Sequence, residues 1–320
     1  MPVVSLKNGT KSRSLLVGND AYTPIGTTGL FVGGNATNRI DYFNITTTGN
    51  ATTFGQLTVN RSAQYGTVAS RVRAIFAGGY DGSNVTKIID YITFSTTGNA
   101  TFFGNMTLEN DIPGGLSNQT RGVLTRGYKS GSGPRANTME YLTIATLGDT
   151  ASFGTIQSVR QSIGVASPTR GVWYIGFGNS NEYINNIDYI TIATLGNGTN
   201  FGTSGGPGGN QAPCSNDIRG VFFGGFGPSG QDVVRETIWY LTIATTGNAT
   251  LFGNLSSARQ DAGACSANGR GVTGGGRTPT NLQSMEYITI ATTGNTTSFG
   301  DMTLTRSGGA GSSNGHGGLV

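Results

Sequence analysis

Short runs of alternating apolar and polar residues, divided by Gly, Asn, Asp, Ser and Thr, dominate this chain. The apolar members are mostly Ile, Val, Phe and Tyr, and the period of two is typical of β-strands. No stretch of a dozen residues keeps a helical period free of Gly, Pro or β-branched runs, so helices are not favoured. The pattern predicts an all-β protein.

One strand pattern recurs six times along the chain. A Tyr is followed twelve residues later by Phe-Gly, and the copies are 47 to 51 residues apart. Between the two markers lies Gly-Asn or Gly-Asp, a dipeptide that favours a tight hairpin turn. Each copy is therefore predicted to contain strand, turn and strand. The Tyr and Phe markers are Tyr42, Tyr91, Tyr141, Tyr189, Tyr240 and Tyr287, and Phe54, Phe103, Phe153, Phe201, Phe252 and Phe299.

A second marker precedes each Tyr and reads as a buried strand that ends in glycine. Its final glycines are Gly34, Gly79, Gly127, Gly176, Gly225 and Gly276. A further polar and apolar segment lies upstream of this strand, so each copy is predicted to hold four short antiparallel strands. A unit of about 50 residues cannot cover both of its faces alone, and a closed ring of such units leaves no exposed edge. We therefore expect a six-bladed β-propeller over residues 26–320.

The chain ends where a seventh copy would begin its glycine-ended strand. Residues 306–320 are therefore predicted to form the innermost strand of blade one, beside residues 29–34, and to close the ring. Residues 1–25 are then left as an N-terminal arm. A fibrous β-solenoid or trimeric shaft is the alternative fold, although solenoid coils are usually shorter than this repeat.

Several repeated residues resemble the kelch repeat over roughly residues 28–320. They are the Gly doublet at a strand end, an aromatic about a dozen residues on, an aromatic closing the next strand, and a later Arg. Phe-Gly stands where kelch repeats have Trp, and Arg126 and Ile175 replace the first Gly of two doublets. The resemblance implies a kelch-like propeller geometry. The later arginines are Arg61, Arg160, Arg259 and Arg306.

The leader SLKNGTKSRSLLVGNDAY and the repeat YLTIATTGNATLFG resemble segments in structural proteins of marine tailed bacteriophages, of the appendage or tail-fibre type. The resemblance implies a virion protein that is assembled in the host cytoplasm and takes part in host attachment. It also implies that residues 1–25 contact other virion proteins.

Charge and composition exclude several functions. The net charge is +4, but the basic residues are scattered rather than grouped on a phosphate-binding face, so no nucleic-acid partner is expected. No apolar run has the length of a signal peptide core or a membrane helix, so we expect neither membrane insertion nor a signal peptide. Cys214 and Cys265 occupy equivalent positions in adjacent copies and are expected to be buried free thiols.

Catalysis is not expected either. One histidine, His316, cannot build a copper site, and no metal or cofactor is expected. Acidic residues directly precede five marker tyrosines and are interpreted as structural, although polysaccharide hydrolysis by a pair of carboxylates remains an alternative. These residues are Asp41, Asp90, Glu140, Asp188 and Glu286, with Glu236 displaced in the remaining copy.

A second repeated charge opens the glycine-ended strands. We expect these arginines to form blade-to-blade salt bridges or a ring of hydrogen bonds, with a positively charged channel mouth as the alternative. They are Arg73, Arg121, Arg170, Arg219 and Arg270.

The loop between the Gly doublet and the marker Tyr changes length from copy to copy, while its neighbours stay fixed. Variable loops on a rigid frame often carry recognition, and these contain aromatic and amide side chains that suit a host-surface glycan or protein. Ordinary solvent loops, and an architectural role that cements virion subunits, are the alternatives, and a homo-oligomer of rings is compatible with either. The candidate binding residues are Tyr80, Asp81, Tyr128, Lys129, Asn181, Tyr183, Phe226, Gln231, Asp232 and Arg277.

Overall fold

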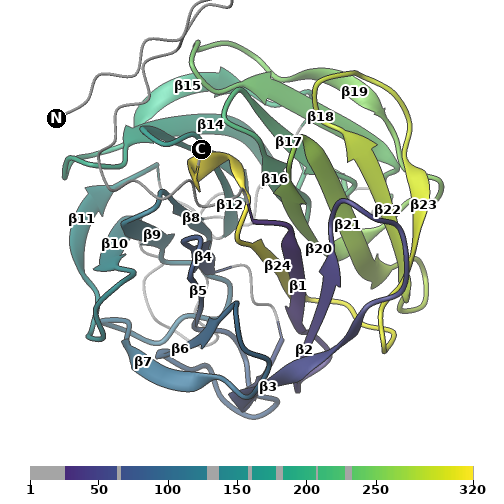
Figure 1. The fold of residues 1–320 in the computed structure, drawn as a ribbon. Coiled ribbons are helices and arrows are strands. Elements are labelled where there is room, and N and C mark those ends of the chain that lie inside the picture. Colours follow the sequence, from purple (N-terminus) through teal and green to yellow (C-terminus); the bar gives the residue numbers. More distant parts are fainter. Residues whose placement is uncertain are drawn as a thin grey trace, which may run out of the picture.

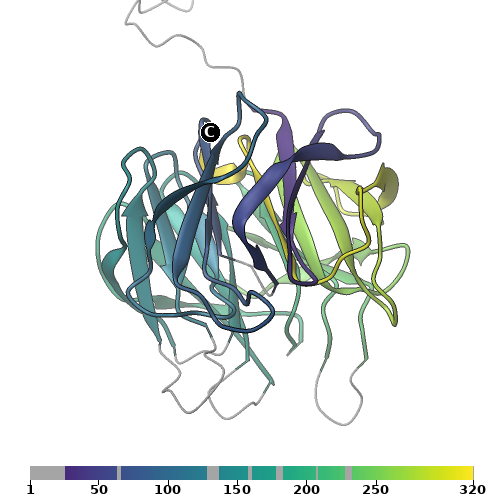
Figure 2. The same ribbon diagram turned by 90° about the horizontal axis from the view of Figure 1, so that it is seen from below.

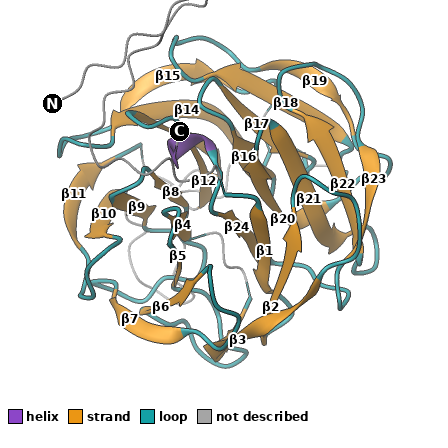
Figure 3. Ribbon diagram, viewed as in Figure 1, coloured by secondary structure: helices purple, strands orange, loops and turns teal. Residues whose placement is uncertain are grey.

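The computed structural model describes residues 26–62, 66–127, 137–157, 161–177, 183–206, 208–227 and 233–319. They form six four-stranded antiparallel sheets arranged as blades around a central axis, as Figure 1 shows. In this part of the chain the only helical element is a 3₁₀ turn, η1 (Gly317–Leu319), beside the axis (Figure 3). The predicted six-bladed propeller is confirmed.

From the axis outward, blade one contains β24 (Gly309–Ser313), β1 (Thr28–Gly33), β2 (Thr37–Asn44) and β3 (Thr52–Arg61). Blade two contains β4 (Thr67–Ala69), β5 (Arg73–Ala77), β6 (Ile88–Thr93) and β7 (Thr101–Asn105), and blade three contains β8 (Gly115–Ser117), β9 (Arg121–Thr125), β10 (Thr138–Thr143) and β11 (Ala151–Thr155).

Blade four contains β12 (Gln161–Ala166), β13 (Arg170–Phe177), β14 (Tyr183–Thr191) and β15 (Thr199–Thr203). Blade five contains β16 (Ala212–Ser215), β17 (Arg219–Phe223), β18 (Thr237–Thr242) and β19 (Thr250–Asn254), and blade six contains β20 (Gln260–Ala267), β21 (Arg270–Arg277), β22 (Ser284–Thr289) and β23 (Thr297–Asp301).

The ring closes as predicted from the repeat count. β24, from the C-terminal end of the chain, pairs antiparallel with β1, with Phe31 opposite Gly311. The last strand thus supplies the innermost position of the first blade, so neither end of the array presents an unpaired sheet.

The hydrophobic core lies between the blades rather than inside them. In one cluster, for example, Leu30 and Ile40 of blade one pack with Ala74 and Phe76 of blade two. Each of the six clusters joins residues of two neighbouring blades. Trp173 is fully buried in the cluster between blades three and four. A single blade therefore contributes to two hydrophobic clusters and contains no complete core of its own.

The Phe-Gly and Gly-Asn markers link neighbouring blades. The N–H of Gly98 in blade two donates to the carbonyl of Phe54 in blade one at 2.9 Å, and the Asn99 side chain accepts from the N–H of Gln56 at 3.1 Å. A Cβ on Gly55 would lie 2.0 Å from the carbonyl oxygen of Gly98, so only glycine fits. Equivalent bonds recur at all six interfaces.

These links correct one prediction. The Gly-Asn segment was expected to form a tight hairpin turn, but it belongs to a seven-residue connection such as 94–100 between β6 and β7. The strand, turn and strand arrangement is confirmed. The connection is longer because its second half extends along the Phe-Gly strand of the preceding blade.

The repeated acids are structural in the described interfaces. Arg61 of blade one and Asp90 of blade two form a fully buried ion pair with 2.8 Å between Nη2 and Oδ2. Asp90 also accepts hydrogen bonds from the backbone and hydroxyl of Thr58. Arg259 with Glu286, and Arg306 with Asp41, repeat the arrangement. A buried charge needs such partners, so these carboxylates are committed to holding blades together.

Two interfaces carry other residues in place of this pair, on one side or on both. Asn110 replaces the Arg between blades two and three and bonds to the Thr125 carbonyl, while Glu140 accepts from Thr107. Between blades four and five, Gly208 and Trp239 stand in the two positions. Arg160 lies outside the described residues, and burial raises the pKa of Asp188, its counterpart.

The arginines that open the second strands also link blades. Nη1 of Arg73 donates to the carbonyls of Ile144 and Ala145 in the next blade, at 3.2 and 2.8 Å, and its guanidinium stacks over Tyr91. Arg121, Arg170, Arg219 and Arg270 repeat both contacts. The expected links between blades are confirmed as hydrogen bonds to backbone carbonyls, and these guanidinium groups do not form a charged channel mouth.

Candidate functional site

The two ends of the central channel differ, and the strand directions define them. All inner strands run toward one face, here called the plug face, where the last residues of the chain lie (Figure 2, top). The opposite face carries the connections from the Gly doublets to the marker tyrosines and is called the loop face. The described parts of the variable loops therefore all lie at one end of the channel.

At the plug face the chain crosses the channel after β24. Arg71 of blade two donates to the carbonyl of Leu319 through Nε at 3.2 Å and Nη2 at 2.8 Å. A Cβ on Gly318 would lie 1.9 Å from the Ser117 carbonyl oxygen, and one on Gly317 would lie 2.1 Å from that of Asn216. This segment, residues 314–319, is called the plug, and its glycines let it press against the backbones of three blades.

His316 is a half-buried side chain of the plug and is held by two hydrogen bonds. Its Nδ1 accepts the N–H of Gly318 at 3.2 Å, so the ring proton is on Nε2, which donates to the carbonyl of Ala69 at 3.1 Å. Burial lowers the pKa of His316 to about 4. The imidazole is thus neutral near pH 7, and both of its nitrogens are used to hold the plug in place.

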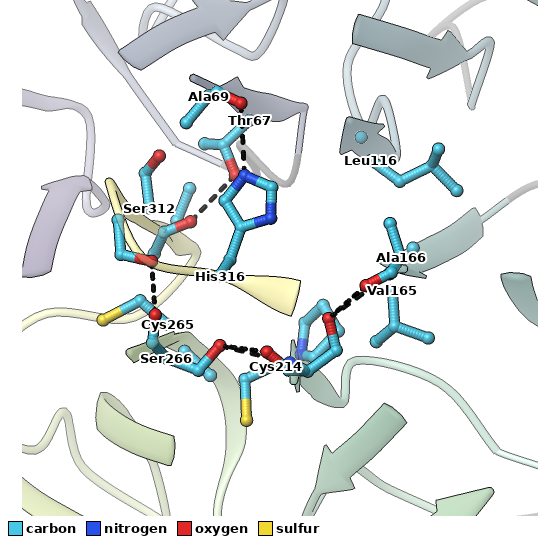
Figure 4. A pocket seen from close by; sticks show the side chains of 18 of the residues that line it. Thr67, Ala69, Leu116, Val165, Ala166, Cys214, Cys265, Ser266, Ser312 and His316 are labelled. Carbon is cyan, nitrogen blue, oxygen red and sulfur yellow. Dashed lines mark hydrogen bonds between the residues drawn. The ribbon is translucent and has the colours of Figure 1, made fainter. Parts of the chain in front are cut away.

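Beneath the plug lies a cavity of about 80 Å³, lined mainly by Gly, Ala and Ser of the inner strands (Figure 4). Serine hydroxyls join the strands around it: Ser215 donates to Ala166, and Ser266 donates to Ser215. Ser313 and Ser117 make the same bond to the preceding blade. Small side chains with committed hydroxyls leave this space without a group that recognises a ligand.

The two cysteines border this cavity but belong to the cores between blades. Both are free and buried, as predicted. A Cβ on Gly271 of blade six would lie 2.6 Å from Cys214 Sγ, so that sulfur lies in the interface. Burial raises the pKa of both thiols, which keeps them protonated and unreactive.

No group of three or more His, Cys, Asp and Glu in the described ranges is placed to hold a metal ion. No helix among these residues is long and apolar enough to cross a membrane.

At the loop face the channel opens into a depression of about 380 Å³, which we call the mouth. Each inner strand has an equivalent Ser or Ala at its plug-face end. The residue five positions earlier lies at the loop-face end of the strand, and its type differs from blade to blade. In blades one, three, four, five and six these residues are Gly308, Ile112, Gln161, Asn210 and Asp261. All but Gln161 line the mouth, with Asn35, Ala36, Ser62, Arg277 and Ser307.

Left-handed backbone is concentrated at the mouth. Of the five non-glycine residues with positive φ in the described chain, four line it: Asn35 (49°), Ala36 (52°), Asn210 (58°) and Asp261 (58°). Such conformations cost on the order of 1 kcal/mol or more for non-glycine residues and often mark functional sites. The mouth therefore contains most of the left-handed non-glycine backbone in the described chain.

Hydrogen bonds hold this backbone in place. The N–H of Asp261 donates to the carbonyl of Asn210 at 3.1 Å, and the N–H of Gly308 donates to the carbonyl of Asp261 at 2.8 Å. Asn35 and Ser307 are joined through backbone and side chains. Arg277 Nε donates to Asp261 Oδ2 at 3.0 Å, in an ion pair exposed on the arginine side.

Of the predicted binding residues that the structure describes, only Arg277 lines the mouth. Tyr80 and Asp81 lie in the blade-two loop, where the Tyr80 hydroxyl donates to the Gly82 carbonyl. The carboxylate of Asp81 accepts from the N–H groups of Ser83 and Asn84, and the Asn84 bond, followed by the Ser83 bond, lowers the pKa of Asp81. These two side chains shape their own loop.

Tyr183 and Phe226 come together across blades four and five, edge to face with 5.5 Å between ring centroids, and both are half-buried. They form a second, off-axis cluster on the loop face. Tyr128, Lys129, Asn181, Gln231 and Asp232 lie outside the described residues.

Sequence reasoning missed Asn35, Ala36, Asn210 and Asp261. The sequence does mark Asn210 and Asp261, because the copies carry Gly, Ile, Gln, Asn or Asp at this position. The other end of each inner strand is always Ser or Ala. Left-handed φ at Ala36 could not be read from residue type, because alanine rarely adopts it.

The sequence matches no known protein family, and no curated protein is detectably similar to it.

Proposed function

We propose that this chain is a non-enzymatic virion protein whose propeller displays the loop face for attachment to a host-surface glycan or protein. The observation that carries the proposal is the asymmetry of the two faces. The plug face is sealed by the chain's own backbone, while the loop face carries an open polar mouth and loops that vary between blades.

The position of residue 26 supports the same orientation. The N–H of Thr28 donates to the side chain of Asn314 in the plug at 2.9 Å, so the first described residues lie at the plug face. An arm that contacts other virion proteins would hold that face toward the particle and direct the loop face outward. The resemblance of the leader and repeat to tailed-bacteriophage structural proteins supplies the virion setting and its assembly in the host cytoplasm.

A kelch-like origin is part of the proposal. In blades one, two, five and six both doublet glycines have left-handed φ, for example Gly33 at 65° and Gly34 at 89°. The buried Arg61, Arg259 and Arg306 stand at the Arg position of the repeat. These features support shared ancestry with kelch propellers.

The mouth favours binding over hydrolysis. Asp261 is the only carboxylate among its described lining residues, and it is paired with Arg277. Glycoside hydrolysis generally needs two carboxyl groups on opposite sides of the bond.

One observation favours the second candidate, an architectural module that cements virion subunits. The plug face carries four exposed apolar side chains in its loops, with relative exposures of 56 to 58%. They are Val72, Leu147, Leu195 and Ile218. Exposed apolar residues of this size suit a protein contact.

Binding of the fluorescently labelled full chain to a panel of marine bacteria separates the attachment function from the architectural role. The variants compared are Arg277→Gln and Tyr183→Ala on the loop face and Leu147→Ser with Leu195→Ser on the plug face. We expect loop-face changes to reduce cell binding and the plug-face pair to leave it unchanged. Absence of cell binding by the unmodified chain would favour the architectural role, and loss of binding in the plug-face pair alone would contradict attachment through the loop face.

A further inference from the structure

The mouth has the volume of a small-ligand site and a mostly polar wall. Its volume of about 380 Å³ lies within the range of about 300–1,000 Å³ found for such sites. Carboxamide and hydroxyl groups from Asn35, Asn210, Ser62 and Ser307 make up much of the wall, and Ile112 and Ala36 are its apolar members. The wall therefore offers a ligand many polar contacts and little apolar surface.

The charges in the wall cancel. Arg277 and Asp261 are its only charged residues in the described chain, and they pair at 3.0 Å. An acidic sugar would compete with Asp261 for the guanidinium and would meet the carboxylate at close range. A neutral polyhydroxyl compound instead finds an acceptor and a donor side by side, since a hydroxyl group both donates and accepts.

The backbone of the mouth is already organised. The bonds from Gly308 to Asp261 and from Asp261 to Asn210 fix three consecutive blades at the wall. A ligand therefore does not have to order these segments, and the ordering cost that usually reduces affinity is small. A peptide partner would need a large apolar anchor in a well-packed pocket, which Ile112 and Ala36 do not provide.

We propose that the mouth binds a neutral sugar residue of a glycan on the propeller axis, with Arg277 donating to and Asp261 accepting from its hydroxyl groups. This inference rests on the proposed attachment function and specifies its ligand class and its position. It places recognition on the axis, away from the aromatic pair Tyr183 and Phe226.

The test is saturation-transfer NMR on the full chain, followed by titration. The probes are methyl glycosides of glucose, galactose, mannose and N-acetylglucosamine, with glucuronic acid and N-acetylneuraminic acid as acidic comparisons. Arg277→Gln and Asp261→Asn remove one charge each while keeping size and backbone bonds. Lys87→Gln removes an exposed charge from the same face away from the mouth and is the matched control, and thermal unfolding checks that every variant is folded.

We expect at least one neutral glycoside to bind, with affinity about tenfold weaker in each mouth variant, as for loss of a hydrogen bond to a charged group, and unchanged in Lys87→Gln. Binding of the acidic sugars alone, or binding that persists in both mouth variants and disappears in Tyr183→Ala, would overturn the axial neutral site but leave attachment through the loop face intact. No binding by any of the six sugars would also overturn this inference, and the cell-panel experiment then decides separately whether the loop face attaches to anything.

Discussion

The two ends of the central channel are built from the same six strands but follow different rules. At the plug face the strand ends are uniformly Ser or Ala, the serine hydroxyls bond to the neighbouring blade, and the chain's own glycines fill the opening. At the loop face the equivalent positions differ in every described blade, and four non-glycine residues hold left-handed backbone. The end with uniform residues is closed by the chain, whereas the end with varying residues and left-handed backbone is an open, polar surface.

The sharpest way to break this comparison is to remove the closed end. Deleting residues 307–320 takes away β24 and the plug, leaving β1 and β20 without the strand they contact. We expect loss of cooperative unfolding, measured by circular dichroism during urea titration, because the ring then has an open edge and an incomplete core. A truncated chain that unfolds cooperatively at the wild-type midpoint would show that closure is dispensable.

Breaking a buried ion pair between two blades should give the next largest loss of stability. Arg61→Met leaves Asp90 buried without its cation, and an uncompensated buried charge costs about 3–5 kcal/mol. The double change Arg61→Met with Asp90→Leu should recover much of that loss. Equal stability of the single and double variants in chemical denaturation would contradict the role given to the pair.

His316 should make the closed end sensitive to acid. Its pKa falls from about 6.5 in an unfolded chain to about 4 in the fold, so the unfolded state binds more protons between these values. Stability therefore falls as the pH drops from about 6.5 to about 4, by up to about 3 kcal/mol. The difference in unfolding free energy between wild type and His316→Gln, measured across this range, should show the slope, and parallel curves would refute it.

Close backbone contact at the plug gives a smaller effect. Gly318→Ala places a Cβ 1.9 Å from the Ser117 carbonyl oxygen, and overpacking of this kind costs about 1–3 kcal/mol. Gly196→Ala is the matched control, because nothing lies within 4 Å of its added Cβ. Thermal unfolding should separate the two variants, and equal melting temperatures would mean that the plug is not tightly seated.

Removing the ion pair of the mouth should have the smallest effect on stability. Arg277 is half exposed and its ion pair is open to solvent, so Arg277→Gln should change the unfolding free energy by less than about 1 kcal/mol. Denaturant titration tests this directly. A larger loss would indicate that the pair serves the frame, as the buried pairs do, rather than the surface.

The repeat explains what could be predicted from sequence and what could not. The Tyr to Phe spacing and the glycine doublets required four strands per copy, and the chain length required β24 to complete blade one. The Gly-Asn contact was invisible, because Gly98 meets Phe54 only when two blades are placed side by side. His316 follows the last repeat and has no equivalent in other copies, so periodicity said nothing of its place over the channel.

Hydrogen exchange followed by mass spectrometry on the full chain, with and without a neutral methyl glycoside that binds, tests the difference between the two ends most directly. Slow exchange at 314–319 in the free protein is predicted, because the Gly318 and Leu319 N–H groups are bonded within the plug. The glycoside should add protection around 260–262, 276–278 and 306–309 and leave 314–319 unchanged. Rapid exchange throughout the plug, or added protection at the plug instead of the mouth, would contradict the assignment of a sealed end and a binding end.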